Sequence, residues 1–119
     1  MENKIYLLNA FSLSMLAPSA FEGGTAKIKV KPIGPEEARE LLTKFGFVSA
    51  IGHESTAAFL SRLLGLPVPY NRVVVQLGRG DSAVIFQLLG RLPEGKVLTE
   101  QELATIRYQF FHLEIEESE

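Results

Sequence analysis

The chain has 119 residues, enough for one domain with a modest core and too few for two. Apolar residues make up 46% of the chain and charged residues 22%, an ordinary globular composition that excludes the disordered and fibrous classes. The net charge of −2 argues against a protein that coats long nucleic acids, and the absence of cysteine excludes disulfides, thiolate metal sites and cysteine nucleophiles.

The first third of the sequence predicts two strands and a helix. Residues Lys4 to Phe11 form a short apolar run, typical of a strand buried on both faces, and "SLSML" after it predicts one helical turn that starts at Ser12. Residues Ala26 to Pro32 alternate lysine with small or apolar residues, which predicts a half-exposed edge strand. The segment "GPEEARELLTKFG" predicts a helix, because Pro35 opens it, two acids follow, and Gly46 ends it.

The remaining elements begin with "SAIGHESTAAFLSRLLG", which predicts an amphipathic helix that His53 precedes and Gly65 ends. The stretch "NRVVVQLGRGDSAVIFQLLG" predicts two apolar strands joined by a glycine-rich turn, a hairpin. A polar loop, "GRLPEGKVLT", follows. Thr99 and Glu102 form a capping-box pattern that predicts a short helix over Glu100 to Arg107, and "YQFFHLEI" predicts the last strand.

This order of elements predicts the fold class. Strands and helices alternate early and an apolar hairpin comes later. We therefore expect a single α/β domain over residues 1–119, with a mixed, mostly parallel sheet and flanking helices in two or three layers.

The two histidines differ in their surroundings. Neither His53 nor His112 belongs to a metal-binding pattern, so we expect no metal. His112 alternates with apolar neighbours on a strand, and we interpret it as structural or surface-exposed. His53 stands at a helix N-terminus, where unpaired backbone N–H groups favour an anion such as phosphate, and an imidazole there can act as an acid or a base near neutral pH. The plain alternative, that His53 or Gly52 only caps the helix, stays open.

Four other residues are weaker candidates. Asn9 and Ser12 follow the first strand, at the edge where α/β sheets bind ligands, although Ser12 is equally explained as an N-cap. Arg91 could clamp a phosphate, although a lone loop arginine is more often solvated, and Glu94 in "LPEG" is by default a turn acid.

Four short motifs together resemble a known family. They are N-A-F-S from Asn9, I-G-H-x-S-T from Ile51, the N-R at Asn71, and R-L-x-E-G-K-x-L from Arg91. Their order and spacing resemble the small ring nucleases of archaeal viruses and phages that act as type III anti-CRISPR proteins, a family with cellular and prophage members as well. The likeness covers nearly the whole chain, apart from Phe21 to Val48 and the acidic tail.

The resemblance implies a two-fold homodimer that binds cyclic tetra-adenylate across its interface. It further implies cleavage without metal or other cofactor, giving linear di-adenylates that end in a 2′,3′-cyclic phosphate and so switching off type III CRISPR signalling. The resemblance implies that the catalytic residues are His53, Arg91 and Glu94, of which Arg91 and Glu94 lie on a lid loop. It implies that the ligand-binding residues are Asn9, Ser12 and Gly52.

The sequence also carries expectations about partners and location. No apolar run approaches the ~18 residues of a membrane span, and the N-terminus shows no signal sequence, so we expect a cytoplasmic protein, in the host cell if the source is a virus. We expect no membrane partner and no long nucleic acid. One alternative is a non-catalytic sponge that sequesters a cyclic nucleotide, and another is a structural or protein-interaction domain in which His53 is only a cap.

Overall fold

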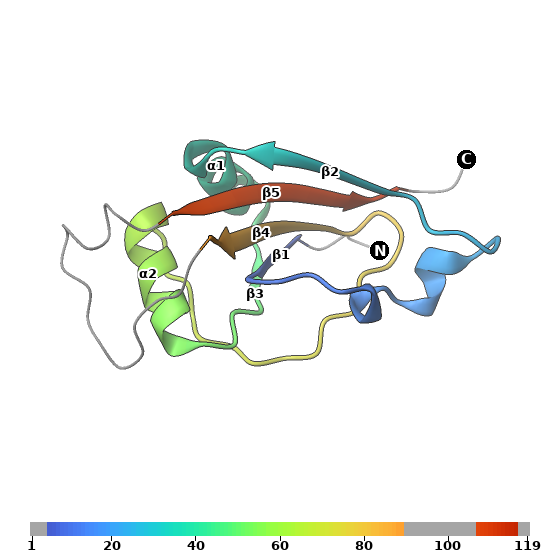
Figure 1. Ribbon diagram of the computed structural model, residues 1–119, viewed down its shortest axis with the longest axis horizontal. Helices are drawn as coiled ribbons and strands as arrows, with labels where there is room; N and C mark the ends of the chain where they lie inside the picture. Colours follow the sequence, from blue (N-terminus) through green and yellow to red (C-terminus); the bar gives the residue numbers. More distant parts are fainter. Residues whose placement is uncertain (1–4, 90–106, 117–119) are drawn as a thin grey trace.

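The strands form one mixed sheet in the computed structural model, which describes residues 5–89 and 107–116 (Figure 1). In these residues the sheet has five strands in the spatial order β2-β5-β4-β1-β3. Their bounds are β1 Ile5–Leu8, β2 Ile28–Ile33, β3 Val48–Ser49, β4 Ser82–Leu88 and β5 Tyr108–Ile115. The helices are α1 Pro35–Phe45 and α2 Glu54–Leu64, with the 3₁₀ turns η1 Leu13–Met15 and η2 Pro18–Phe21. The predicted α/β class is confirmed.

The strand pairings are divided evenly between parallel and antiparallel. β1 runs parallel to both of its neighbours, with Leu7 opposite Ser49 of β3 and Val84 of β4. β5 runs antiparallel to β4 and to β2. The mixed sheet is confirmed, but parallel pairings are not the predicted majority, because β5 runs against both of the strands beside it.

Local sequence signals account for the edge strand and the helix ends. β2 lies at the edge of the sheet and contains Pro32, which an edge position tolerates because proline has no N–H to donate. Pro35 occupies the start of α1, and Gly65 ends α2 in the left-handed conformation with φ 66°. These three predictions are confirmed.

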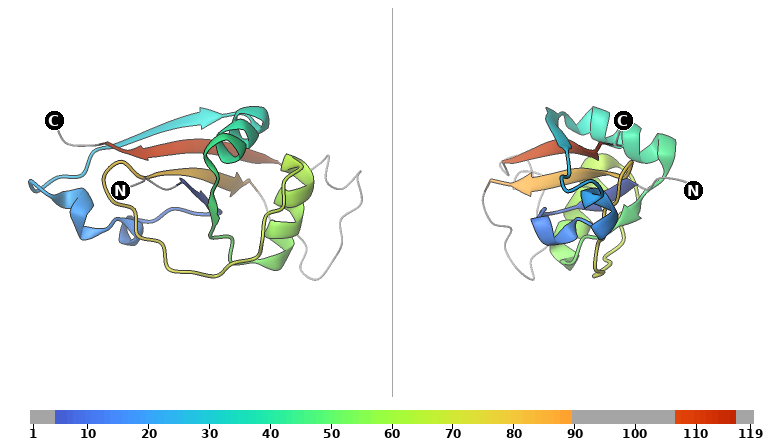
Figure 2. Two further views of the ribbon diagram at one scale, coloured as in Figure 1. Left: turned by 180° about the vertical axis from the view of Figure 1, so that it is seen from behind. Right: turned by 90° about the vertical axis from the view of Figure 1, so that its right-hand side faces the viewer.

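Each face of the sheet carries its own apolar core. Both helices pack on one face, around buried residues that include Leu42 of α1, Phe59 of α2 and Phe86 of β4. The opposite face is covered in part by η1, η2 and the extended chain at 75–77, which bury a second cluster. Figure 2 shows these short turns at one end of the sheet, away from the helices. The helices of the described chain therefore make two layers with the sheet.

The predicted hairpin before β4 is wrong. β4 already pairs with β1 on one side and with β5 on the other, so the valine run that precedes β4 cannot pair with it as a hairpin requires. This run stays extended, and its main contact is at Leu77, which exchanges backbone hydrogen bonds with Met15 (2.7 Å) and Ala17 (2.8 Å). Val75 and Leu77 are buried there, whereas Val74 is 91% exposed.

Within residues 5–89 and 107–116, no helix has the length and hydropathy of a membrane span. The predicted helix over Glu100 to Arg107 lies outside the described residues, apart from Arg107 itself, which precedes β5 in irregular structure.

Candidate functional site

The carboxyl ends of the three parallel strands meet at one edge of the sheet. The chain leaves β1 into Asn9, leaves β3 into the segment 50–53 that leads to α2, and leaves β4 into Leu89. Figure 1 shows α2 lying across this end of the sheet. Because α/β sheets bind ligands beyond the carboxyl ends of their parallel strands, a binding site is expected at this edge.

His53 is the N-cap residue of α2, but only through its backbone. Its backbone is extended (φ −133°, ψ 127°), and its carbonyl oxygen accepts a hydrogen bond from the N–H of Ala57 at 3.0 Å. Its side chain makes no capping hydrogen bond and is exposed. The imidazole is therefore not used to cap the helix, and it stands beside N–H groups that have no partner within the helix.

The segment that leads to His53 is held by hydrogen bonds from the chain after α2. The hydroxyl of Ser49 donates to the carbonyl oxygen of Pro69 at 2.7 Å, and the side-chain amide of Asn71 donates to the carbonyl oxygen of Ser49 at 2.7 Å. The backbone N–H of Asn71 donates to the carbonyl oxygen of Ile51 at 2.9 Å. Ser49 and Ile51 are buried, so these bonds fix the approach to α2.

The same hydrogen bonds bring Arg72 against Gly52. A Cβ atom built on Gly52 would lie 3.5 Å from Cγ of Arg72, so the arginine stem packs directly over the glycine that precedes His53. Arg72 is exposed and adds a positive charge next to the positive end of the helix dipole. Arg72 is marked in the sequence only by the Asn-Arg pair before the valine run, which does not by itself indicate a role.

A pocket of about 540 Å³ opens at the carboxyl ends of β1 and β4. Asn9, one of the predicted ligand-binding residues, contributes to its wall, as does Thr56 from the first turn of α2. Among the residues that the structure describes, those that line it are Asn9, Ala10, Phe11, Val30, Thr56, Ile85, Phe86, Gln87, Leu88, Phe111 and Leu113. Asn9 and the first turn of α2, which follows His53, therefore contribute to the same pocket.

The other predicted site residues that the structure describes, His53 among them, do not line this pocket. Ser12 occupies the N-cap position of η1, where its hydroxyl bonds to that of Ser14 at 2.7 Å and makes no capping hydrogen bond. Neither Ser12 nor Gly52 lines the pocket. Arg91 and Glu94 lie outside the described residues.

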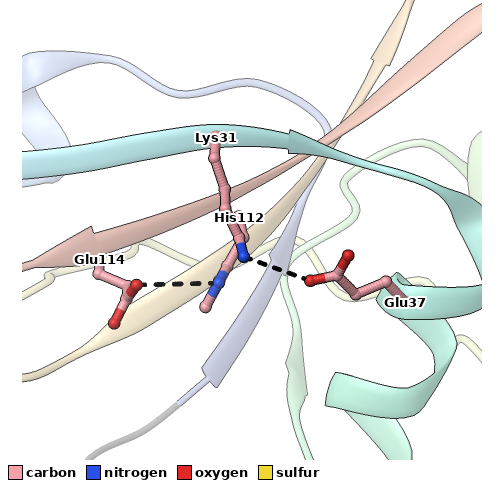
Figure 3. Close-up of polar contacts among 4 residues, drawn as sticks. All are labelled: Lys31, Glu37, His112 and Glu114. Atoms are coloured by element: carbon pink, nitrogen blue, oxygen red, sulfur yellow. Dashed lines mark ion pairs between the residues drawn. The ribbon is translucent and has the colours of Figure 1, made fainter.

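His112 lies in the middle of β5, among polar groups of the sheet and α1 (Figure 3). Its Nδ1 atom is 3.9 Å from a carboxylate oxygen of Glu114, and Lys31 opposite it on β2 forms a 3.5 Å ion pair with Glu37 of α1. The side chain of His112 is only 14% exposed. This position agrees with the structural interpretation, and within the described residues no group of three His, Cys, Asp or Glu side chains could hold a metal ion.

Similar proteins come from viruses and from a bacterium. The family model described as STIV B116-like matches residues 5–110. ORF117 of Acidianus two-tailed virus is 38% identical over 112 residues, which cover 92% of this chain and 91% of that protein. YddF of Bacillus subtilis is 37% identical over 87 residues, which cover 71% and 81%. The solved structure of B116 of Sulfolobus turreted icosahedral virus superposes with a TM-score of 0.78 at 32% identity, covering 94% of this chain and 99% of that one.

Proposed function

The chain belongs to the STIV B116-like family, which includes proteins of archaeal viruses, and we propose that it is a metal-independent ring nuclease for cyclic tetra-adenylate. The products are linear di-adenylates with a 2′,3′-cyclic phosphate. Removing this messenger from the cytoplasm switches off type III CRISPR signalling, so a viral copy acts as an anti-CRISPR protein. The observation that carries the proposal is the exposed His53 ring, which is not used for capping and lies beside the N-terminus of α2. The identity of the substrate is inferred from the motif resemblance.

The chemistry requires a proton donor rather than a metal-activated water. The ribose 2′-oxygen attacks the adjacent phosphorus, the bond from phosphorus to the 5′-oxygen breaks, and the 2′-hydroxyl proton leaves to water. His53, in its protonated form, donates a proton to the departing 5′-oxygen. No water is consumed, and two such cuts open the ring into two di-adenylates.

The surroundings of His53 suit the charge that develops on phosphate. The N–H groups of the first turn of α2 can donate to the non-bridging oxygens, which carry more charge in the transition state. Arg72, which packs over Gly52, adds a cation on the same side of the segment. In this proposal Arg91 is a second clamp, and Glu94 orients Arg91 or contacts a ribose.

The direct test incubates the purified protein with cyclic tetra-adenylate in EDTA and identifies the products by mass spectrometry. We expect linear di-adenylates with cyclic phosphate ends. Tight binding without cleavage would instead show a sponge. If the protein neither binds nor cleaves the ring, the role of His53 is limited to capping α2 through its backbone.

The assembly is a first prediction. Cyclic tetra-adenylate has two-fold symmetry and each chain offers one His53, so we expect a C₂ homodimer that presents two equivalent sites to one ligand. Light scattering coupled to gel filtration at micromolar concentration should give twice the chain mass of 13.2 kDa. A monomer mass with and without ligand contradicts this assembly.

The arginines are expected to behave as clamps. Replacing Arg72 or Arg91 with alanine removes a charge-assisted hydrogen bond to phosphate, which acts both before and during the reaction. Each variant should therefore weaken binding and single-turnover cleavage together, by about 10- to 100-fold. Arg39→Ala, on the exposed surface of α1, is the matched control and should change neither. A loss of cleavage with unchanged binding would argue against the clamp role.

A further inference from the structure

The backbone that leads to the proposed catalytic histidine is held by a short segment that follows α2, residues 69–72, here called the brace. The side-chain amide of Asn71 donates to the carbonyl oxygen of Ser49 at 2.7 Å, and its backbone N–H donates to the carbonyl oxygen of Ile51 at 2.9 Å. The hydroxyl of Ser49 in turn donates to the carbonyl oxygen of Pro69 at 2.7 Å. Among these bonds, the amide bond of Asn71 is the one that a side chain of the brace makes, so a substitution there can loosen the brace.

The imidazole of His53 is not held directly by the described chain. The ring is exposed and makes no hydrogen bond with another described residue. The residue before it, Gly52, has no side chain, so its backbone has more freedom than that of other residue types. The stem of Arg72 packs over this glycine, 3.5 Å from the position that a Cβ atom would take. The direction of the imidazole therefore depends on the backbone at 49–52, which the brace holds.

Proton transfer is sensitive to this direction. A general acid must lie within about 2.6–3.2 Å of the atom that it protonates. A displacement of about 1 Å, even from a change far from the chemistry, can lower the rate by about 100-fold. Binding of the phosphate depends less on the ring, because the N–H groups of α2 and the Arg72 guanidinium do not move with it. Loosening the brace should therefore affect proton transfer before it affects binding.

We propose that Asn71 is a positioning residue for this proton transfer, because its amide bond to Ser49 fixes the backbone that directs His53 at the departing 5′-oxygen. This inference rests on the proposed function for the identity of the reaction. Asn71 acts through the backbone and takes no proton itself. The Asn-Arg pair then has two separate tasks, since Asn71 holds the segment and Arg72 covers the glycine within it.

The test uses Asn71→Ala, which removes the amide and keeps the backbone bond to Ile51. Single-turnover cleavage of cyclic tetra-adenylate should fall by about 10- to 100-fold, while the dissociation constant changes by less than about threefold. A second substrate carries sulfur in place of the 5′-bridging oxygen, so its leaving group needs no proton. Asn71→Ala should cut that ring within about threefold of the wild-type rate. A merely structural role would slow the cleavage of both rings alike.

Ser61→Ala is the matched control, because it loosens the same connection at its other end. The hydroxyl of Ser61 accepts a hydrogen bond from the N–H of Val68 at 2.9 Å. Both variants should lower the midpoint of urea denaturation, but Ser61→Ala should cleave the natural ring at the wild-type rate. Ser49→Ala removes the hydroxyl bond to the brace and should give the Asn71→Ala pattern in weaker form. If Asn71→Ala does not fold, Ser49→Ala decides, and equal losses on the two rings would overturn the positioning role.

The outcomes separate this inference from the proposed function. If the wild type cleaves cyclic tetra-adenylate and Asn71→Ala cuts both rings at the wild-type rate, or loses both equally, the positioning role is wrong and the nuclease stands. If the wild type cleaves neither ring, the nuclease is wrong, and the brace is judged by NMR relaxation. The order parameters of the Gly52 and His53 amides should then fall in Asn71→Ala and not in Ser61→Ala, and unchanged order parameters overturn the inference.

Discussion

His53→Ala should lower single-turnover cleavage of cyclic tetra-adenylate by at least about 100-fold, the lower end of the range for a lost general acid. The dissociation constant should change by less than about tenfold, because the proton is needed only as the bond to the 5′-oxygen breaks. The α2 N-terminus and Arg72 remain to hold the phosphate. The measurement pairs rapid-mixing cleavage under enzyme excess with calorimetric titration of the same variant.

Two controls make this result specific to a proton donor. His112→Ala makes the same change at the only other histidine, in the middle of β5, and should cleave at the wild-type rate. A ring with sulfur in place of the 5′-bridging oxygen has a leaving group that needs no proton, so His53→Ala should cut it nearly as fast as the wild type does. If His53→Ala cuts the natural ring at the wild-type rate, or if the sulfur ring restores nothing, His53 is not the general acid.

The elements that could be predicted from the sequence are those fixed by local signals. Pro35 and Gly65 mark helix ends through backbone geometry alone, and the lysine alternation of β2 shows its exposed edge. The valine run before β4 was misread because its residues favour a strand, while strand pairing depends on which edges are free. That information is not local.

The same distinction applies to the candidate site. The position of His53 at the start of α2 follows from the apolar stripe after it, so this position could be predicted from the sequence alone. Arg72 reaches Gly52 because Asn71 bonds to the chain at 49–51, which lies 20 to 22 residues earlier in the sequence. Gln87 lines the pocket because of the register between β1 and β4. Neither relation leaves a pattern in a single sequence.

The packing of α2 on the sheet depends on the ring of Phe59, which a substitution by alanine removes. Phe59 of α2 is 4% exposed and lies 5.5 Å from Phe86 and 6.1 Å from Tyr108, measured between ring centroids. Phe59→Ala should lower the free energy of unfolding by about 3–5 kcal/mol, through lost burial and the cavity left behind. Because small domains have only about 5–15 kcal/mol in total, the midpoint of urea denaturation should fall by a large fraction.

The matched control is Phe45→Ala, the same change at the last residue of α1, where the ring is 61% exposed. Its only described ring contact is with the amine of Lys44, 5.3 Å from the centroid, so the loss should be at most about 1 kcal/mol. Because His53 begins the helix that Phe59 anchors, hydrogen exchange of the α2 amides should also rise in Phe59→Ala and not in Phe45→Ala. Equal destabilisation by the two changes would mean that the aromatic cluster does not hold α2, and the position of His53 would then have to be fixed by the hydrogen bonds of Ser49 and Asn71.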